Sequence, residues 1–334
     1  MMRYIGYAPV GESIAMLIAL TPVSRMSQLF LLSSKNRWLF FEQLSQKSFM
    51  LTLVEIIVYP EEFCYISGYI NAEQHSSCAT FVLQELVEKL SVEETGELLL
   101  QPFGYTTQLL EYLIDTALSG TVMSVRRSAT KLLNFLLRRV ADSEILYMVS
   151  AGGGQAPAPA YVPNRLFPLR DRIINQIHLR IKCFMDALVI SDDEYNNENI
   201  GKYKDGDEIE ENENENDHEN NQNGGTGIGK YHYNGNGNHG NQNQNQNLSD
   251  GVSNFLSETS LFPVKYSAYT VNKPFTVLRS LFFELITLLV ESKDSVADSI
   301  SVDLWVLLIK WILKYAHNSI FHAIFFRLIY SVLR

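Results

Sequence analysis

The sequence ends in three apolar stretches that follow one another over residues 274–334, and none has a glycine or proline inside its apolar run. They read PFTVLRSLFFELITLLVES, SVADSISVDLWVLLIKWILKYA and NSIFHAIFFRLIYSVLR. Apolar residues recur three or four positions apart in the first two, at Leu278, Phe282, Leu285, Leu289, Leu304, Leu308, Trp311 and Tyr315. This spacing gives each helix an apolar stripe that a neighbour must cover. The block therefore predicts a stack of helices, as in a helical-repeat solenoid.

The N-terminal part shows the same helical pattern, and no alternation typical of strands competes with it. The expected helices span Glu12 to Leu20, Asn36 to Leu44, Ser48 to Val58, Asn71 to Leu90, Thr106 to Leu118 and Val122 to Ala141. Gly120 separates the last two, where it predicts a left-handed helix cap and a helical hairpin. No exact repeat is visible, which fits degenerate helical pairs of roughly 40 to 47 residues.

Two segments interrupt the helical pattern. Ser150–Pro163 reads SAGGGQAPAPAYVP and predicts a loop, after which Pro168 opens one long helix to about Ile190. The expected stripe of that helix is Leu169, Ile173, Ile177, Ile181, Phe184 and Leu188. Between Ser191 and Asn254 apolar residues almost vanish, and Asn, Glu, Gly and Gln replace them. Such a composition cannot offset the entropy of ordering, so this segment is predicted to be disordered.

These patterns divide the chain into three parts. Residues 1–190 form the first part of a helical-repeat domain, 191–273 a disordered acidic and Asn-rich insert with a linker, and 274–334 the continuation of the domain. Residues 191–220 hold thirteen Asp and Glu against two Lys, which accounts for the whole net charge of -10. The helical body is thus nearly neutral and presents no basic face for nucleic acid. The insert is interpreted as a tolerated loop insertion; the alternative is that its acidic half, Asp192–Glu219, docks a partner.

Several classes of function are disfavoured by the sequence. GGTGIGKY resembles a phosphate-binding loop, but it lies in the Asn-rich stretch without a strand or helix around it, and Tyr231 stands where the loop needs Ser or Thr. Cys64, Cys78 and Cys183 lack zinc-site spacing and are expected to be buried thiols. No catalytic motif is found, so we expect no enzyme, no cofactor and no metal site.

The sequence also bears on the location of the protein in the cell. The N-terminus lacks a secretory signal, which predicts an intracellular, reducing compartment, the cytoplasm or the nucleus. The longest candidate for a membrane span, Leu304 to Ala316, is interrupted by Lys310 and Lys314 and is too short, so no membrane span is expected. A membrane-associated protein built on residues 275–334 remains a competing interpretation. Because both ends of the sequence are apolar and helical, whereas solenoids close with polar caps, we expect a piece of a longer protein.

Candidate partner-binding residues come from basic pairs on the helices. There are two such pairs, Arg126 with Arg127 and Arg138 with Arg139, and both fall outside the apolar stripe of Val125, Ala129, Leu132, Leu133 and Leu136. They are interpreted as part of a solvated face; the alternative is that they contact an acidic partner. His317 and His322 are five residues apart, which does not place them on one helix face for a metal.

The order of the segments resembles the SAPS-domain family, the regulatory subunits of protein phosphatase 6 and its fungal counterpart. The resemblance lies in YIGYAPVGESIAMLIAL, in Phe40–Glu62 with the following NAEQHSSCATFVLQELV, in PFTVLRSLFFELITLL and in KYAHNSIFHAIFFRLIYSVL. The matching positions are Ile5, Gly6, Ile14, Leu17, Pro60, Asn71, Ala72, Ala79, Pro274, Arg279, Leu285, Tyr315, Asn318, Phe321 and His322. Thr276 replaces the usual Gly, Leu169 and Arg170 are in swapped order, the Asn-rich insert is extra, and the family's N-terminal portion has no counterpart.

The resemblance implies an armadillo-like or HEAT-like scaffold that binds a protein phosphatase 6-type serine/threonine phosphatase catalytic subunit and directs its substrate choice. It implies no catalytic residues. Asn318 and His322 are the further candidates for partner contact, and the alternative for them is a helix N-cap and a packed histidine. The competing function is a generic helical-repeat adaptor between proteins, unrelated to phosphatases.

Overall fold

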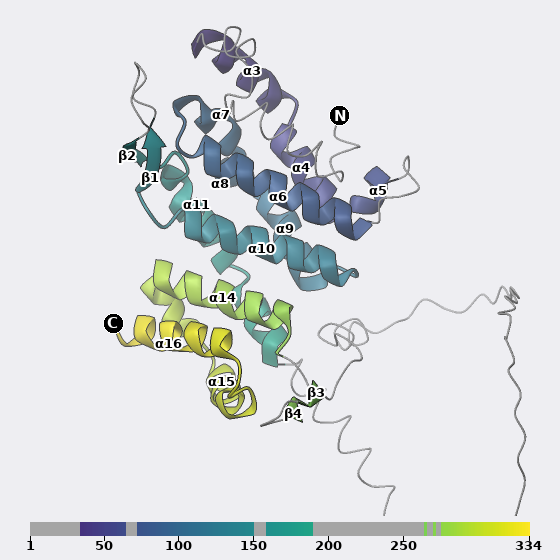
Figure 1. The fold of residues 1–334 in the computed structure, drawn as a ribbon, viewed down its shortest axis with the longest axis vertical. Helices are drawn as coiled ribbons and strands as arrows, with labels where there is room; N and C mark the ends of the chain where they lie inside the picture. The colour runs from purple at the N-terminus through teal and green to yellow at the C-terminus, as the bar shows by residue number, and fades with distance from the viewer. Residues whose placement is uncertain (1–33, 65–71, 150–157, 190–263, 266–269, 272–274) are drawn as a thin grey trace, which may run out of the picture.

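The computed structural model describes residues 34–64, 72–149, 158–189, 264–265, 270–271 and 275–334. Helices account for 80% of these residues, which confirms the all-α helical-repeat fold (Figure 1). The expected helix at Glu12 to Leu20, the phosphate-loop-like GGTGIGKY and nearly all of the insert lie outside the described residues. Within the insert only β3 (Val264–Lys265) and β4 (Thr270–Val271) are described, as an antiparallel pair.

The helices form two layers. One layer contains α6 (Ala72–Leu90), α10 (Met123–Arg139), α14 (Val277–Ser292) and α16 (Ser319–Leu333), each in contact with the next (Figure 1). Behind it lie α4 (Phe49–Val58), α9 (Thr107–Ser119), α11 (Arg170–His178) and helical residues 181–189. The remaining helices are α3 (Ser34–Gln46), α5 (Pro60–Cys64), α7 (Glu97–Leu100), α8 (Pro102–Tyr105) and α15 (Val302–Lys314). Short 3-10 turns occupy Glu94–Gly96, Phe167–Leu169 and Asp294–Ser299.

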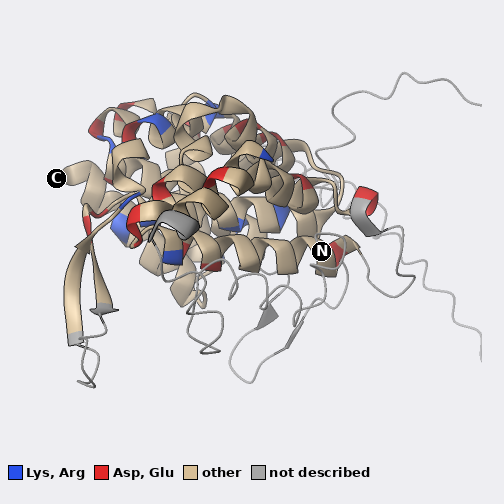
Figure 2. Cartoon of the chain, turned by 90° about the horizontal axis from the view of Figure 1, so that it is seen from above, with Lys and Arg blue, Asp and Glu red and all other residues tan. Residues whose placement is uncertain are grey.

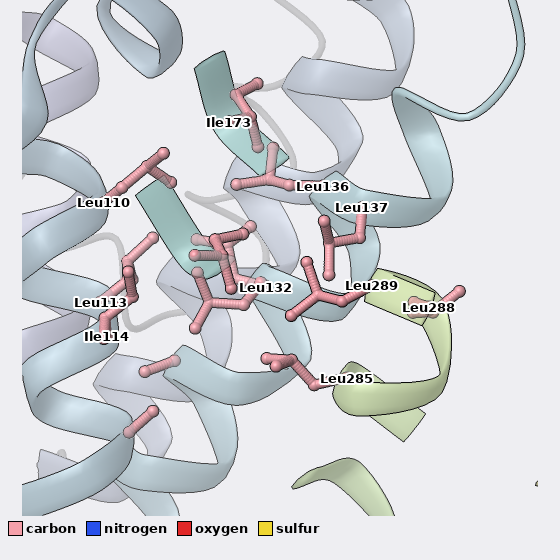
Figure 3. Close-up of a cluster of buried hydrophobic side chains, with 14 of the residues drawn as sticks. Leu110, Leu113, Ile114, Leu132, Leu136, Leu137, Ile173, Leu285, Leu288 and Leu289 are labelled. Carbon is pink, nitrogen blue, oxygen red and sulfur yellow. The ribbon is translucent and has the colours of Figure 1, made fainter. Parts of the chain in front are cut away.

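The core continues across the insert. Figure 3 shows the leucine-rich centre where α9, α10, α11 and α14 meet, with side chains from Leu113, Leu132, Ile173, Leu285 and Leu289 among those labelled. All five are fully buried. Because α14 supplies this centre together with helices that precede the insert, residues on both sides of it belong to one hydrophobic core.

The three C-terminal helices share one way of starting. Each begins after a polar residue whose side-chain oxygen accepts a hydrogen bond from the backbone N–H three positions on, which satisfies one of the unpaired donors of the first turn. Thr276 accepts from the N–H of Arg279 at 3.3 Å, Ser301 from that of Leu304 at 3.2 Å, and Asn318 from that of Phe321 at 3.0 Å. Behind them Phe275, Trp311, Tyr315 and Phe321 stack edge-on or tilted in one aromatic cluster, which fixes α14, α15 and α16 together.

The segment predicted as a loop is in part a β-hairpin. β1 (Glu144–Val149) pairs antiparallel with β2 (Ala158–Pro163), with Glu144 opposite Pro163 and Val149 opposite Ala158. The hairpin projects from the helical body (Figure 2). Asn164, which is 3% exposed, anchors its base, because its side-chain amide donates to the carbonyls of Arg139 at 2.6 Å and Asp142 at 2.7 Å. The same bonds satisfy carbonyls at the end of α10.

The prediction of one long helix from Pro168 is also wrong in one respect. Its six stripe residues are all buried, as predicted, but the helix breaks at Leu179 and Arg180. At about 100° per residue, these six positions fall within an arc of about 120° on a straight helix, because the three-residue step from Ile181 to Phe184 offsets the four-residue steps. The spacing of the stripe therefore does not account for the turn at residues 179–180.

Candidate protein-binding surface

The outer face of α6, α10, α14 and α16 is an extended surface formed by four helices lying side by side (Figure 1). We call it the ridge face. On α10 it consists of half-buried Arg127, exposed Lys131 and Arg138, whose side chain is 57% exposed. Their spacings of four and seven residues place them on one side of the helix. An exposed aromatic ring lies on α6, at Phe81, and two lie on α16, at Phe326 and Tyr330.

An ion-pair network joins three helices of the ridge face. Glu284 of α14 accepts a hydrogen bond from Arg138 of α10, and it lies 3.8 Å from the guanidinium of Arg327 of α16. Arg327 also holds Glu291 with two bonds, Nε at 3.1 Å and Nη2 at 2.7 Å, and these raise the pKa of Arg327 above its ordinary value. Such two-pronged pairs fix orientation as well as charge. The network therefore holds the exposed side chains of α10 and α16 in a set register.

Of the cations on α10, Lys131 differs from Arg138 in its surroundings. Arg138 is paired with Glu284, whereas Lys131 makes no ion pair with a described residue. Residues of both charge signs are spread along the helices, with many uncharged residues between them (Figure 2). The ridge face thus offers a mixed surface with arginine and exposed aromatic rings, the residue types enriched where proteins contact one another.

The structure corrects the expectation of a solvated face for Arg126. Its residue is 3% exposed, and its guanidinium points back at the end of α9. Nε donates to Ala117 O at 3.0 Å, and Nη2 donates to Ala117 O at 3.0 Å and to Leu118 O at 2.6 Å. Burial lowers the pKa of Arg126 to about 9, so the side chain is still charged at neutral pH. Arg126 therefore acts as a side-chain cap for α9.

The prediction that Gly120 is a left-handed helix cap is wrong. This glycine has another role. Its φ of -58° and ψ of 137° suit any residue, but a Cβ there would lie 2.6 Å from Thr116 O and 3.0 Å from Cγ of Arg126. Glycine thus gives Arg126 room to reach the end of α9.

We expect Gly120→Ala to lower the free energy of unfolding by about 1 to 3 kcal/mol, because a backbone oxygen at that distance cannot move aside cheaply. Urea denaturation followed by circular dichroism measures this loss. Ser119→Ala, on the exposed neighbour, serves as the control and should change stability by less than about 1 kcal/mol. A Gly120→Ala protein as stable as that control would show that no close approach constrains this position.

Asn318 and His322 belong to α16, which α14 separates from α10. Asn318 is the N-cap of α16, as the alternative interpretation had it. His322 is half-buried, with its ring centroid 5.8 Å from that of Phe321, and its Nε2 is buried without a hydrogen-bond partner among the described residues. The four candidate residues therefore do not form one site, and of them Arg127 is the one on the ridge face.

A shallow hollow of about 370 Å³ lies where the hairpin meets α10. Arg138, Arg139, Asp142, Glu144 and Tyr161 are among the residues that line it, so its charges are of both signs. Arg139 is committed to the fold, since it donates to Ser91 Oγ and to Glu88 O, both at 2.9 Å. This hollow could not be predicted from the sequence because it depends on the hairpin.

Three further expectations concern the cysteines, metal binding and membrane spans. Cys183 is exposed and Cys78 is half-buried, so the prediction of buried thiols is wrong for Cys183; burial raises the pKa of the Cys78 thiol. Within the described ranges, no three His, Cys, Asp or Glu side chains gather as a metal ion would require. None of the helices among these residues is both long and apolar enough to cross a bilayer.

The protein was also compared with known proteins. No family model matches the chain, and neither a curated protein nor a solved structure matches it.

Proposed function

We propose that this protein is a non-catalytic scaffold that binds a protein phosphatase 6-type serine/threonine phosphatase catalytic subunit and directs its substrate choice. The proposal rests on the segment-by-segment resemblance to the SAPS-domain family. The observation that carries it is the ridge face, in which four adjacent helices offer one extended surface held in register by Arg138, Glu284 and Arg327. Helical arrays commonly bind partners along such surfaces.

A scaffold of this kind acts by holding its partners close together. The bound catalytic subunit supplies the hydrolysis, while the length of the ridge face leaves room for a second protein beside it. Holding a substrate near the catalytic subunit raises its effective concentration there without any new chemistry. Substrate choice would then follow from the side chains exposed on the face, such as Lys131 and Phe81.

A pull-down tests the proposal. Tagged protein is recovered from extract of its own cells, immunoblotted for the phosphatase 6-type catalytic subunit, and assayed for phosphatase activity. Recovery of that subunit with activity is the expected result. Recovery of a different stable partner without any phosphatase catalytic subunit would contradict it and favour the generic adaptor.

Charge reversal at Lys131 tests the ridge face as the contact. We expect Lys131→Glu to lower recovery of the catalytic subunit about tenfold, because an exposed charge at a contact surface affects association while leaving the fold intact. Lys182→Glu is the matched control, since Lys182 is also exposed but lies on residues 181–189 of the other layer. Equal recovery by the two variants would exclude the centre of the ridge face as the contact.

A further inference from the structure

The outer side of α15 carries an apolar stripe that no described residue covers. It consists of Val302, Val306, Ile309 and Leu313, which are 76%, 45%, 57% and 80% exposed. The opposite side of α15 is buried through Leu304, Leu308 and Trp311. α15 lies at the lower end of the array in Figure 1, beside α16. An exposed aliphatic stripe of this length, on a helix whose opposite side is buried, marks a contact surface.

The spacing of the stripe suits a second copy of itself. Its members are separated by four, three and four residues, so the order is the same in both directions along the helix. When two copies of α15 lie antiparallel about a two-fold axis, Val302 faces Leu313 of the partner subunit and Val306 faces Ile309 of the partner subunit. A two-fold contact requires this self-complementarity, in which residue i meets j and j meets i.

The charges beside the stripe suit the same arrangement. Asp303, Lys310 and Lys314 lie on one flank of α15, because seven and eleven residues are close to two and three helical turns. In a two-fold antiparallel pair the same flanks of both helices come together. Asp303 then lies within about 3 Å, measured along the helix axis, of both Lys310 and Lys314 of the partner subunit. Within the described residues, neither Asp303 nor Lys310 forms an ion pair in the single chain.

We propose that α15 is a homodimer interface, in which the stripe Val302, Val306, Ile309 and Leu313 packs antiparallel against its copy and Asp303 pairs with Lys310 across the two-fold axis. Two helices of this length make a small interface by the standards of stable dimers, so the dissociation constant is expected to be roughly micromolar. The contact uses residues outside the ridge face and does not depend on the proposed function.

Sedimentation velocity of the full chain over a wide concentration range tests the interface. The mass is expected to rise with concentration from the 38.0 kDa of one chain towards twice that value. Ile309→Lys should raise the dissociation constant by at least about a hundredfold, because the two-fold axis places two buried lysines in one contact. Leu179→Lys, which alters a residue 81% exposed at the turn after α11, should leave it unchanged.

A charge swap separates pairing from a general loss of structure. Lys310→Asp should weaken the dimer about tenfold, since it sets like charges opposite each other twice, and adding Asp303→Lys should restore it. Circular dichroism should show the same helical content in all variants. The proposal would be overturned if the wild-type chain stays monomeric at every concentration. It would also be overturned if Ile309→Lys does not weaken the dimer, or if the double swap fails to restore association.

Discussion

Replacing Phe282 by alanine is expected to lower the free energy of unfolding by about 3 to 5 kcal/mol. The ring is fully buried on α14 and meets Phe184 edge-on, with centroids 5.1 Å apart and planes at 84°. Phe184 belongs to helical residues 181–189, which precede the insert, so the pair joins both parts of the array. Removing the ring loses this contact and leaves a cavity that the packed helices cannot close. Urea denaturation followed at the helical circular dichroism signal measures the loss.

The same experiment asks whether the helices after the insert depend on those before it. With one shared core, the unfolding curve of Phe282→Ala should shift as a single transition. Phe326→Ala on α16 is the matched control, because its ring is 63% exposed and its removal should cost less than about 1 kcal/mol. A variant curve that splits into two steps, with one step unshifted, would contradict a shared core.

The helices could be predicted from the sequence because their signal is local. The expected spans Asn71–Leu90 and Thr106–Leu118 agree with α6 and α9 to within one residue at each end. Apolar residues at helical spacing mark the buried side, and residues such as Ser301 and Asn318 mark where a helix begins. Neither signal requires knowledge of the rest of the chain.

The hairpin could not be predicted because it depends on contacts between residues that are distant in the sequence. β1 follows α10 directly and is anchored by Asn164, whose amide bonds to Arg139 and Asp142 form only once the chain has turned back. The break at residues 179–180 could not be predicted because the buried positions on both sides of it also fit one straight helix. The local pattern indicates neither feature.

The candidate surface was predictable only in part, for the same reason. The basic residues of α10 are visible in the sequence, but their separation into buried and exposed is not, because α10 is enclosed by α6, α9 and α14. Adjacent Arg126 and Arg127 thereby acquire different surroundings. The partner that orients Arg138 is Glu284, 146 positions away. Pairing over such a separation becomes visible only in the folded chain.

The second large effect on stability is expected at Arg126. Arg126→Met is expected to lower the free energy of unfolding by about 2 to 4 kcal/mol, because methionine fills much of the volume but leaves the carbonyls of Ala117 and Leu118 buried without this donor. Arg126→Lys should lose about half as much, since an ammonium keeps the charge but cannot reproduce the guanidinium fork. Denaturant unfolding of the three proteins under one buffer condition gives both differences.

Arg138→Met on the same helix is the control for this series, because Arg138 is exposed and its ion pair with Glu284 contributes about 1 kcal/mol or less. If Arg126→Met were as stable as Arg138→Met, the cost of burying the guanidinium would cancel the benefit of its bonds, and Arg126 would not be needed to hold α9. The expected order of stability is Arg138→Met, then Arg126→Lys, then Arg126→Met. This order would establish that buried Arg126 stabilises the array, whereas exposed Arg138 on the same helix contributes little to stability.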